Sequence, residues 1–518
     1  MKKLSIKKFL MIFSVQLTIA VVTALNISPI VVQAAEANTA KVNNYANGNM
    51  ASIAANTKAI SVDGLYNKAL NSMDVLPQGS LDRAKSAIKD GTLRIAFLGD
   101  SITEGADLSS YSYSYASQVS EELKKALPGV NVITENFSLG ARNLGHLVND
   151  NYKAVDRETD HTFNFHRNWS VTGKSWKDHV KDFNPDLLII AFGMNDAMYN
   201  DSDESFGYNL DKFVNFTKTW TKTPDLVLVP TMLPTSDNSR YTQRQDITNA
   251  VAAVAREYAK ENGYICADAN RLFQILRDGK DPEATYGVTK SNPSEVREFK
   301  NGTIEFDATF KAVGDDGGRN IIYRNNNMGS IIIQMKANDD GTGTASLYLS
   351  GSDSTYVTIG SSKNVTYDFN ESGEPITIIN QGENVKVSPV QAVKIPSLQL
   401  NNTYKVKIEA NGINHKIYLN DTLLMDISKY KKVIGGTIAA RPTGKDPFEI
   451  KNFTVKADVS YTETPNFTED ELLGRYNQPG ESGNGINHLN DFGQGIVYAK
   501  AFNGVINELK KSYTGSGN

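Results

Sequence analysis

The sequence predicts an α/β domain with a parallel sheet that is interrupted by an all-β insertion. Apolar, strand-like runs alternate with amphipathic helical stretches over residues 76–282, and helical texture returns over residues 461–518. Between them, residues 283–460 consist of short β-rich runs broken by Gly, Asn and Asp. Alternating strands and helices are typical of a parallel sheet with helices on both faces, and the middle region is typical of an antiparallel sandwich of the jelly-roll type.

Five strand-like runs are expected in the α/β domain. The third is apolar throughout, as in a strand covered on both faces, and Pro230 indicates that the fourth ends near that residue. A helix over residues 81–89 precedes the first strand, and an amphipathic helix over residues 245–262 precedes the fifth. The expected strands are residues 94–99, 130–136, 186–192, 225–232 and 264–267.

The insertion carries strand and hairpin signals. Residues 302–310 alternate apolar and polar with period two. Two further runs, 404–409 and 415–419, flank Asn411-Gly412, which predicts a β-hairpin. No helical period is found between residues 302 and 456, whereas a final helix is expected over residues 494–511. The C-terminal elements are therefore expected to complete the α/β domain after the insertion.

Composition excludes several classes of protein. The chain has 518 residues, of which 40% are hydrophobic and 22% charged, which fits two to four packed domains. A formal net charge of -4 gives no basic footprint for nucleic acid. The single Cys excludes an intrachain disulfide, a Cys-based zinc ribbon and a CxxC redox centre. Six His residues leave few candidates for a catalytic base and do not favour a His-rich metal site.

The first 34 residues have the pattern of a secretory signal peptide. Four lysines precede the apolar residues 9–24, and Val32-Gln33-Ala34 is a small-x-small cleavage pattern, so cleavage is expected after Ala34. An uncleaved anchor is the alternative; no later stretch approaches the ~20 apolar residues of a membrane span. Removal would leave 50 basic and 58 acidic residues, a formal net charge of −8. Residues 35–75, rich in Ala and Asn, are expected to be a linker or a pro-like segment of a secreted protein, with room for one helix.

Ser101 follows the first strand in the run Gly99-Asp100-Ser101. With Glu104 it fits a capping box, so Ser101 could simply cap the next helix. The alternative is a functional serine, because open α/β sheets bind ligands beyond the carboxyl ends of their strands. Its main-chain N–H would then lie at a helix N-terminus, where it could stabilise a developing oxyanion.

Three further polar blocks lie at comparable places. Gly140 ends Asn136-Phe-Ser-Leu-Gly140 after the second strand and would allow close approach of the main chain to a ligand; Arg142 and Asn143 follow without a role that the sequence itself indicates. Asn195, in Gly193-Met-Asn-Asp196, follows the third strand and could donate from its amide. His488 precedes the last helix. Each block alone is explained by an ordinary turn.

Together, these four blocks resemble the SGNH, or GDSL, hydrolase family, which is named for such a Ser, Gly, Asn and His. The resemblance covers roughly residues 76–282 and 461–518. It implies a flavodoxin-like three-layer α/β/α domain with a five-stranded parallel sheet. It also implies ester hydrolysis through a covalent acyl-enzyme, with no metal and no organic cofactor.

The resemblance assigns a role to each block. Ser101 would be the nucleophile and His488 the base, because a serine hydroxyl is a poor nucleophile until a neighbouring base activates it. The main-chain N–H groups of Ser101 and Gly140, with the side chain of Asn195, would form the oxyanion hole.

The third catalytic member is open in the sequence. The family usually places an Asp three residues before the His, and here that position is Gly485. Asn484 and Asp491 are the candidates nearby, although Asp491 is also explained as an acid at a helix N-terminus. A main-chain carbonyl that orients His488, giving a Ser–His dyad, is the further alternative.

The insertion resembles a concanavalin A-like, or laminin G-like, sandwich, on segments such as residues 403–412 and 448–455. Such domains often bind glycans; the alternative is a structural module that shapes the rim of the pocket. All three Trp residues lie in the first domain, so tyrosines would have to stack on sugars: Tyr323, Tyr348, Tyr356 or Tyr418. Calcium binding by the sandwich is left open.

Other titratable groups are expected to have structural roles. His415 is expected to face solvent and Cys266 to be a small buried residue of the fifth strand. Three histidines lie in a stretch that could line the pocket: His161, His166 and His179.

The leading hypothesis is a secreted serine esterase that removes small acyl groups, foremost acetyl, from a polysaccharide. A lipase or thioesterase on the same scaffold is the first alternative. The second is a non-catalytic glycan-binding surface protein with a relict hydrolase core. No nucleic acid partner and no membrane span after signal cleavage are expected.

Overall fold

The computed structural model describes residues 60–61, 63–153, 169, 173–198, 203–237, 239–240, 245–314, 318–326, 329–350, 365–369, 375–379, 391–412, 414–427, 435–442 and 448–514. The expected signal peptide and most of the expected linker lie outside these residues. So do His161, His166 and Tyr356.

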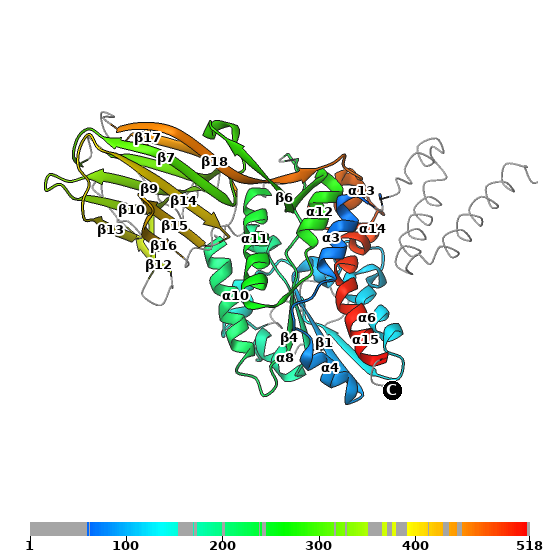
Figure 1. Cartoon of the computed structure of the whole chain (residues 1–518). Helices are drawn as coiled ribbons and strands as arrows, with labels where there is room; N and C mark the ends of the chain where they lie inside the picture. Colours follow the sequence, from blue (N-terminus) through cyan, green and yellow to red (C-terminus); the bar gives the residue numbers. More distant parts are fainter. Residues whose placement is uncertain are drawn as a thin grey trace, which may run out of the picture.

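A five-stranded, all-parallel sheet with the order β2-β1-β3-β4-β5 forms the centre of the α/β domain (Figure 1). All five predicted strands are confirmed. The fourth is shorter than predicted, because it ends before Pro230, which lacks the N–H that a ladder needs. The strands are β1 (Thr92–Gly99), β2 (Asn131–Asn136), β3 (Leu187–Ala191), β4 (Asp225–Leu228) and β5 (Ile265–Cys266).

Helices cover both faces of this sheet. Alternate residues of β1 enter opposite cores: Ile95 and Phe97 pack in one, Ala96 and Leu98 in the other. The first core is completed by α3 (Leu65–Met73), α4 (Asp82–Lys89), α6 (Tyr115–Ala126), α12 (Ala269–Asp278), α13 (Glu469–Leu473) and α15 (Asn503–Thr514). The second is completed by α7 (Leu144–Val148), α8 (Trp176–Phe183), α10 (Asp203–Thr217) and α11 (Gln245–Asn262). The predicted three-layer α/β/α fold is therefore confirmed.

The predicted C-terminal helix is interrupted at its start. Gln494–Tyr498 forms a π-helical turn and Ala499–Phe502 a 3-10 turn, and a regular helix, α15, begins only at Asn503. Tyr498 stacks on Tyr115 of α6 at a centroid distance of 5.0 Å, and its hydroxyl accepts from the N–H of Met232. The irregular turns thus place the buried Tyr498 in contact with both α6 and the segment after β4.

The insertion forms an antiparallel sandwich, as predicted. A five-stranded sheet, β13-β10-β9-β8-β17, packs on a six-stranded sheet, β16-β15-β14-β7-β18-β6, across one apolar core. The bounds are β6 (Lys280–Lys290), β7 (Gly302–Phe310), β8 (Arg319–Asn326), β9 (Gly329–Ala337), β10 (Gly343–Ser350), β13 (Gln391–Ile395), β14 (Thr403–Asn411), β15 (Asn414–Leu419), β16 (Thr422–Ile427), β17 (Thr437–Pro442) and β18 (Phe448–Thr462), with a separate pair of β11 (Val365–Phe369) and β12 (Pro375–Ile379).

The predicted hairpin at Asn411-Gly412 is confirmed, with Asn411 opposite Asn414. The expectation that His415 faces solvent is wrong. His415 is 1% exposed, and its Nδ1 lies 3.1 Å from the hydroxyl oxygen of Tyr323, within hydrogen-bond distance. It shares the inward face of β15 with Ile417 and Leu419, because side chains two apart in a strand point the same way. Tyr323 is itself fully buried, so it offers no surface for a sugar.

The chain enters and leaves the sandwich through neighbouring strands. β6 directly follows α12, and β18 pairs with it antiparallel, so that Lys280 lies opposite Thr462. Figure 1 shows β6 and β18 running from the sandwich to the α/β domain. The two segments of the α/β domain are therefore brought together at the base of this ribbon.

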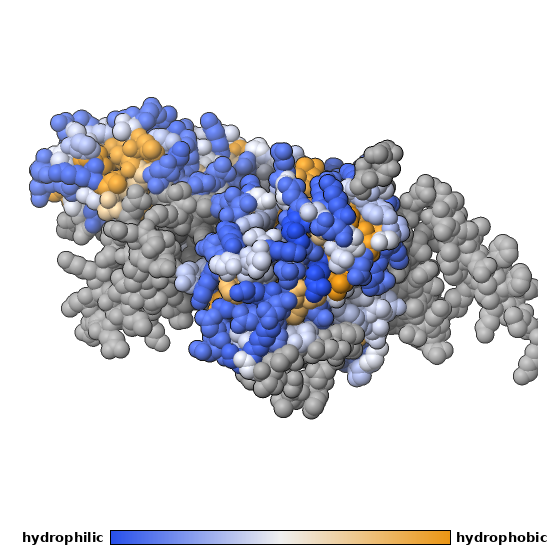
Figure 2. All heavy atoms as spheres, turned by 90° about the horizontal axis from the view of Figure 1, so that it is seen from below, coloured by the Kyte–Doolittle hydropathy of each residue, from blue (hydrophilic) through white to orange (hydrophobic). Residues whose placement is uncertain are grey.

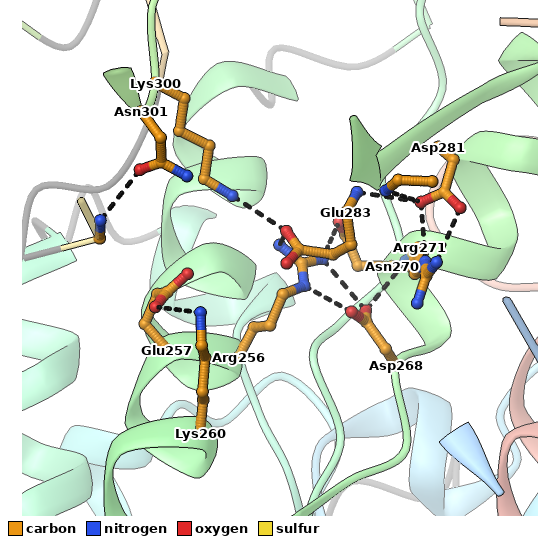
Figure 3. Close-up of polar contacts among 12 residues, drawn as sticks. Arg256, Glu257, Lys260, Asp268, Asn270, Arg271, Asp281, Glu283, Lys300 and Asn301 are labelled. Carbon is orange, nitrogen blue, oxygen red and sulfur yellow. Dashed lines mark hydrogen bonds and ion pairs between the residues drawn. The ribbon is translucent and has the colours of Figure 1, made fainter. Parts of the chain in front are cut away.

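A cluster of charged residues links the two parts (Figure 3). Arg256 of α11 contacts Asp268, with Nε donating to Oδ2 at 2.5 Å, and lies 3.4 Å from a carboxylate oxygen of Glu283 on β6. Lys300, in the insertion, pairs with the same carboxylate of Glu283 at 2.9 Å. These cations lower the pKa of Glu283 to about 2, against the effect of its burial. Glu283 is therefore ionised and tied to both domains.

The molecular surface seen in Figure 2 is mainly hydrophilic over the described α/β domain, with apolar residues in smaller patches. Within the described residues, none of the helices combines the length and the apolar character needed to cross a membrane.

Candidate active site

Ser101 lies at the turn from β1 into α5 (Ser101–Glu104). The helix cap is Asp100, not Ser101: Asp100 has an extended backbone, and its Oδ1 accepts from the Ile102 N–H at 3.0 Å. Gly105, with φ of 88°, ends α5 after a single turn. Since Asp100 performs the capping, the Ser101 hydroxyl is available for another contact.

That contact is with His488. Ser101 Oγ and His488 Nε2 are 2.7 Å apart, and both residues are buried. The loop that carries His488 is organised by Asn484, whose Oδ1 accepts from the main-chain N–H groups of Ile486, Asn487 and His488 at 2.9–3.0 Å. The fold thus brings together the nucleophile and base that the sequence resemblance assigns.

The other imidazole nitrogen faces Asp107, which the sequence reasoning missed. His488 Nδ1 lies 2.5 Å from Asp107 Oδ2, and the hydrogen bond to His488 lowers the pKa of Asp107 despite its partial burial. With Nδ1 protonated, Nε2 is the acceptor for the Ser101 hydroxyl. Asp107 therefore occupies the place of the third catalytic member.

Both sequence candidates for that place have other partners. Asp491 accepts from the Ser109 N–H at 3.1 Å and from its hydroxyl at 2.5 Å, and Asn484 shapes the His488 loop through its main-chain contacts. Asp107 follows Ser101 by six residues, on the nucleophile's own loop, with φ of 60°. The sequence signal for Asp107 is its place as an acid six residues after Ser101, whereas the resemblance points to an acid near His488.

The loop of Asp107 and the loop of His488 are held together in more than one place. The Gly483 N–H donates to the Asp107 carbonyl at 2.7 Å, in addition to the Asp491–Ser109 and His488–Asp107 contacts. This bracing fixes the distance between the imidazole and its acid.

The predicted oxyanion hole is only partly assembled. The Gly140 N–H donates to Glu104 Oε2 at 2.9 Å, so in this structure it is already engaged by a buried carboxylate. The positive φ in this turn belongs to Ala141, at 53°, rather than to Gly140. Asn195 is 3% exposed, and its Nδ2 donates to the Arg142 carbonyl at 3.1 Å. The Ser101 N–H lies in the first turn of α5, where helices lack an internal acceptor.

Asp100 is the buried acid closest in sequence to the nucleophile. It is 1% exposed, and its Oδ2 has no hydrogen-bond partner among the described residues. Burial raises the pKa of Asp100 to about 7, although the N–H of Ile102 and the charge of His488 act against this. Burial therefore makes the ionised form of this carboxyl less favourable than in an ordinary aspartate.

The remaining residues with functional potential have structural positions. His179 is 4% exposed and packs against Trp169. Cys266 lies on β5, and burial raises the pKa of its thiol, so it is not a reactive thiolate. Across the part of the chain that the structure describes, no group of three or more His, Cys, Asp or Glu residues could hold a metal ion.

One family model matches the part of the chain that carries Ser101 and Asn195. Residues 97–290 match the model of the GDSL-like Lipase/Acylhydrolase family, a range that contains Ser101 and Asn195 and ends before His488. Among curated proteins, none matches the chain.

Two solved structures illustrate the structural likeness. An acetylxylan esterase from Geobacillus stearothermophilus is 15% identical, with 36% of this chain and 80% of that chain covered and a TM-score of 0.26. A lipase/acylhydrolase from Enterococcus faecalis is 18% identical, with 36% and 83% covered and a TM-score of 0.26. At these values neither substrate transfers to this chain.

Proposed function

We propose that this ester hydrolase, which carries a GDSL-like lipase/acylhydrolase domain, is a secreted serine esterase. It would remove small acyl groups, foremost acetyl, from a carbohydrate. The observation that carries the catalytic part is the line Ser101 Oγ, His488 and Asp107, with contacts of 2.7 and 2.5 Å. A hydroxyl hydrogen-bonded to an imidazole that a carboxylate orients is the arrangement that nucleophilic catalysis by serine needs.

The mechanism follows from these contacts. His488 Nε2 takes the Ser101 proton as Oγ attacks the ester carbonyl, and Asp107 stabilises the imidazolium that forms. The Ser101 N–H and the Asn195 amide would stabilise the oxyanion. His488 then protonates the leaving alcohol, an acyl-serine remains, and a water activated by the same imidazole releases the acid.

The geometry also favours an active enzyme over a relict core. A decayed site would not be expected to keep a buried Ser101 and His488 at 2.7 Å, together with a carboxylate on the second nitrogen. The proposal therefore assigns catalysis, rather than glycan binding alone, to the α/β domain.

The carbohydrate part of the proposal rests on two other observations. One is the signal-peptide pattern of residues 1–34, and the other is the resemblance of the sandwich to concanavalin A-like domains. Of the tyrosines considered for sugar stacking, Tyr418 lies half-buried on the outer face of β15, where the Lys407 ammonium is 4.2 Å from its ring centroid. Its hydroxyl donates to Glu409 at 3.0 Å, so this face offers an aromatic ring among polar groups.

The direct experiment measures acetate release from a panel of acetylated polysaccharides by the wild type and by Ser101→Ala. Release by the wild type and its loss in the variant are expected. No Ser101-dependent release from any acetylated polysaccharide would overturn the carbohydrate assignment. Rates on p-nitrophenyl esters of increasing chain length separate the alternatives, because a maximum at long chains would indicate a lipase or thioesterase.

Secretion is tested separately, by N-terminal sequencing of protein recovered from the medium of expressing cells. A mature chain beginning at Ala35 is expected. Protein retained in the cells with Met1 intact would contradict it.

A further inference from the structure

Arg142 is a positively charged residue next to Asn195, the predicted oxyanion donor. Its main-chain oxygen accepts a hydrogen bond from Asn195 Nδ2 at 3.1 Å. Asn195 follows β3, which pairs with β1, the strand that precedes Ser101. The main chain of Arg142 therefore contacts the amide that is expected to polarise the ester carbonyl, and its guanidinium belongs to the same turn.

The side chain of Arg142 is fixed by neutral groups. Nε donates to the Tyr152 hydroxyl at 2.5 Å and Nη1 to the Ala141 carbonyl at 3.0 Å. The guanidinium carbon is 5.7 Å from the centroid of the Tyr152 ring, which His146 in turn contacts edge-on. A guanidinium held in this way loses little conformational freedom when it binds a ligand.

Among the described residues, no carboxylate pairs with this guanidinium. Its side chain has two hydrogen bonds within the part of the chain that the structure describes, to the Tyr152 hydroxyl and to the Ala141 carbonyl. Elsewhere in the domain, by contrast, Arg256 and Arg271 each bind an aspartate. Arg142 is also half-buried, so solvent screens its charge less than that of a fully exposed arginine.

We propose that Arg142 binds an anionic group of the substrate, so that the preferred substrate is an acyl ester of an acidic saccharide with a carboxylate close to the ester. This inference rests on the proposed function, since it names the substrate class of the same site. A guanidinium with N–H donors left over matches the geometry of a carboxylate, and an incoming carboxylate supplies a counter-charge that the described residues do not provide there.

The other flank of the site favours a saccharide over a lipid. Asp107 is 40% exposed at its side chain, and the residues beyond it on the two braced loops are Ser109 and Asp491, both with polar side chains. Polar side chains at this rim suit a hydroxylated substrate, whereas an acyl lipid would need an apolar surface.

The test compares two acetylated substrates that differ only in charge, an acetylated methyl glucuronoside and its uronamide, with acetate release as the readout. The wild type is expected to prefer the carboxylate. In Arg142→Gln, the ratio of kcat/KM for the two substrates should fall about tenfold, the size of one charge-assisted hydrogen bond. Arg142→Lys, which keeps the charge but not the planar fork, should give an intermediate ratio.

Two controls keep the test interpretable. Lys124→Gln removes one positive charge from α6, where Lys124 pairs with Glu121, and should leave the ratio unchanged. Raising the salt concentration from about 0.01 to 1 M should reduce the wild-type preference, because salt screens a charge contact at a half-exposed site. This second readout does not depend on the folding of any variant.

Three results would overturn the inference: no preference for the carboxylate in the wild type, an unchanged ratio in Arg142→Gln, or faster hydrolysis of acetylated glycerol phosphate than of the uronate. Failure of the proposed function looks different, since neither saccharide would then release acetate in a Ser101-dependent way.

Discussion

Asp107 and His488 are 381 residues apart in the chain, and their side chains meet at 2.5 Å through Asp107 Oδ2 and His488 Nδ1. Ser101, the proposed nucleophile, and Asp107 therefore share one loop, and His488, the proposed base, lies beyond the inserted domain in the chain. In the arrangement that the sequence resemblance implies, the acid and the base would share a loop instead.

Asp107→Asn should reduce kcat on p-nitrophenyl acetate by about 10²–10³-fold, because an amide can hold the imidazole but favours the wrong tautomer and cannot stabilise the imidazolium. KM should change little. Asp491→Asn is the matched control, since Asp491 bonds Ser109; it should retain most of the activity. A larger loss in Asp491→Asn than in Asp107→Asn would contradict the assignment.

Asn195→Ala should lower kcat by about 10²–10³-fold with little change in KM, the usual effect of removing one oxyanion donor. Steady-state kinetics on the same ester measure it. The variant also loses the contact to the Arg142 carbonyl, so its melting temperature is compared with that of the wild type. If kcat is unaffected, Asn195 is a structural residue of the turn and not a donor.

Glu283→Gln should destabilise the protein by about 1–3 kcal/mol at neutral pH, because it removes a partly buried partner of Arg256 and Lys300. The pKa of Glu283 is lowered to about 2, so its stabilisation is complete above the ordinary pKa of a glutamate and disappears as the pH falls toward 2. Chemical unfolding at pH 7 and near pH 3 measures the difference.

The control for this prediction is Glu298→Gln, which breaks a pair between Glu298 and Lys280 in which Glu298 is 56% exposed. It should cost less than about 1 kcal/mol. Equal effects of the two variants, or an effect of Glu283→Gln that does not shrink in acid, would show that the cluster in Figure 3 does not join the domains energetically.

Asp100→Asn should stabilise the protein at high pH relative to low pH. Burial raises the pKa of Asp100 to about 7, so ionisation costs stability progressively as the pH rises from about 4 through 7. Asparagine keeps the capping oxygen and removes this cost. The difference in Tm between variant and wild type should grow from pH 4 to pH 8; a constant difference would contradict the burial argument.

Much of the fold follows from local patterns that the sequence carries. The apolar run of β3 and the amphipathic period of α11 depend on neighbouring residues only, and both were predictable. The same holds for the hairpin at Asn411-Gly412. The inward position of His415 also follows from a local pattern. His415 is two residues from the buried Ile417 in the same strand, so both side chains point to the same face, and the expectation of a solvent-facing His415 was wrong.

The site residues that follow strands could be predicted from the sequence. Those that meet through contacts between loops could not. Ser101 and Asn195 follow strands whose carboxyl ends must lie together, so their proximity could be inferred. Asp107 itself has a positive φ, and its carbonyl accepts from the Gly483 N–H, so its contact with His488 depends on how two loops pair in space, which no local pattern predicts. Likewise, the side chain of Glu104 accepts a hydrogen bond from the Gly140 N–H, a contact that the positions of the two residues in the sequence do not predict.

The pairing of β6 with β18 at the base of the sandwich has a consequence for biosynthesis. The segment with Ser101 leaves the ribosome long before the segment with His488, and the intervening sandwich must be made before the two can meet. Contacts at such long separations form late in folding. A chain cut short anywhere before residue 488 would thus carry the proposed nucleophile without its proposed base, so hydrolytic activity would report complete synthesis of the chain.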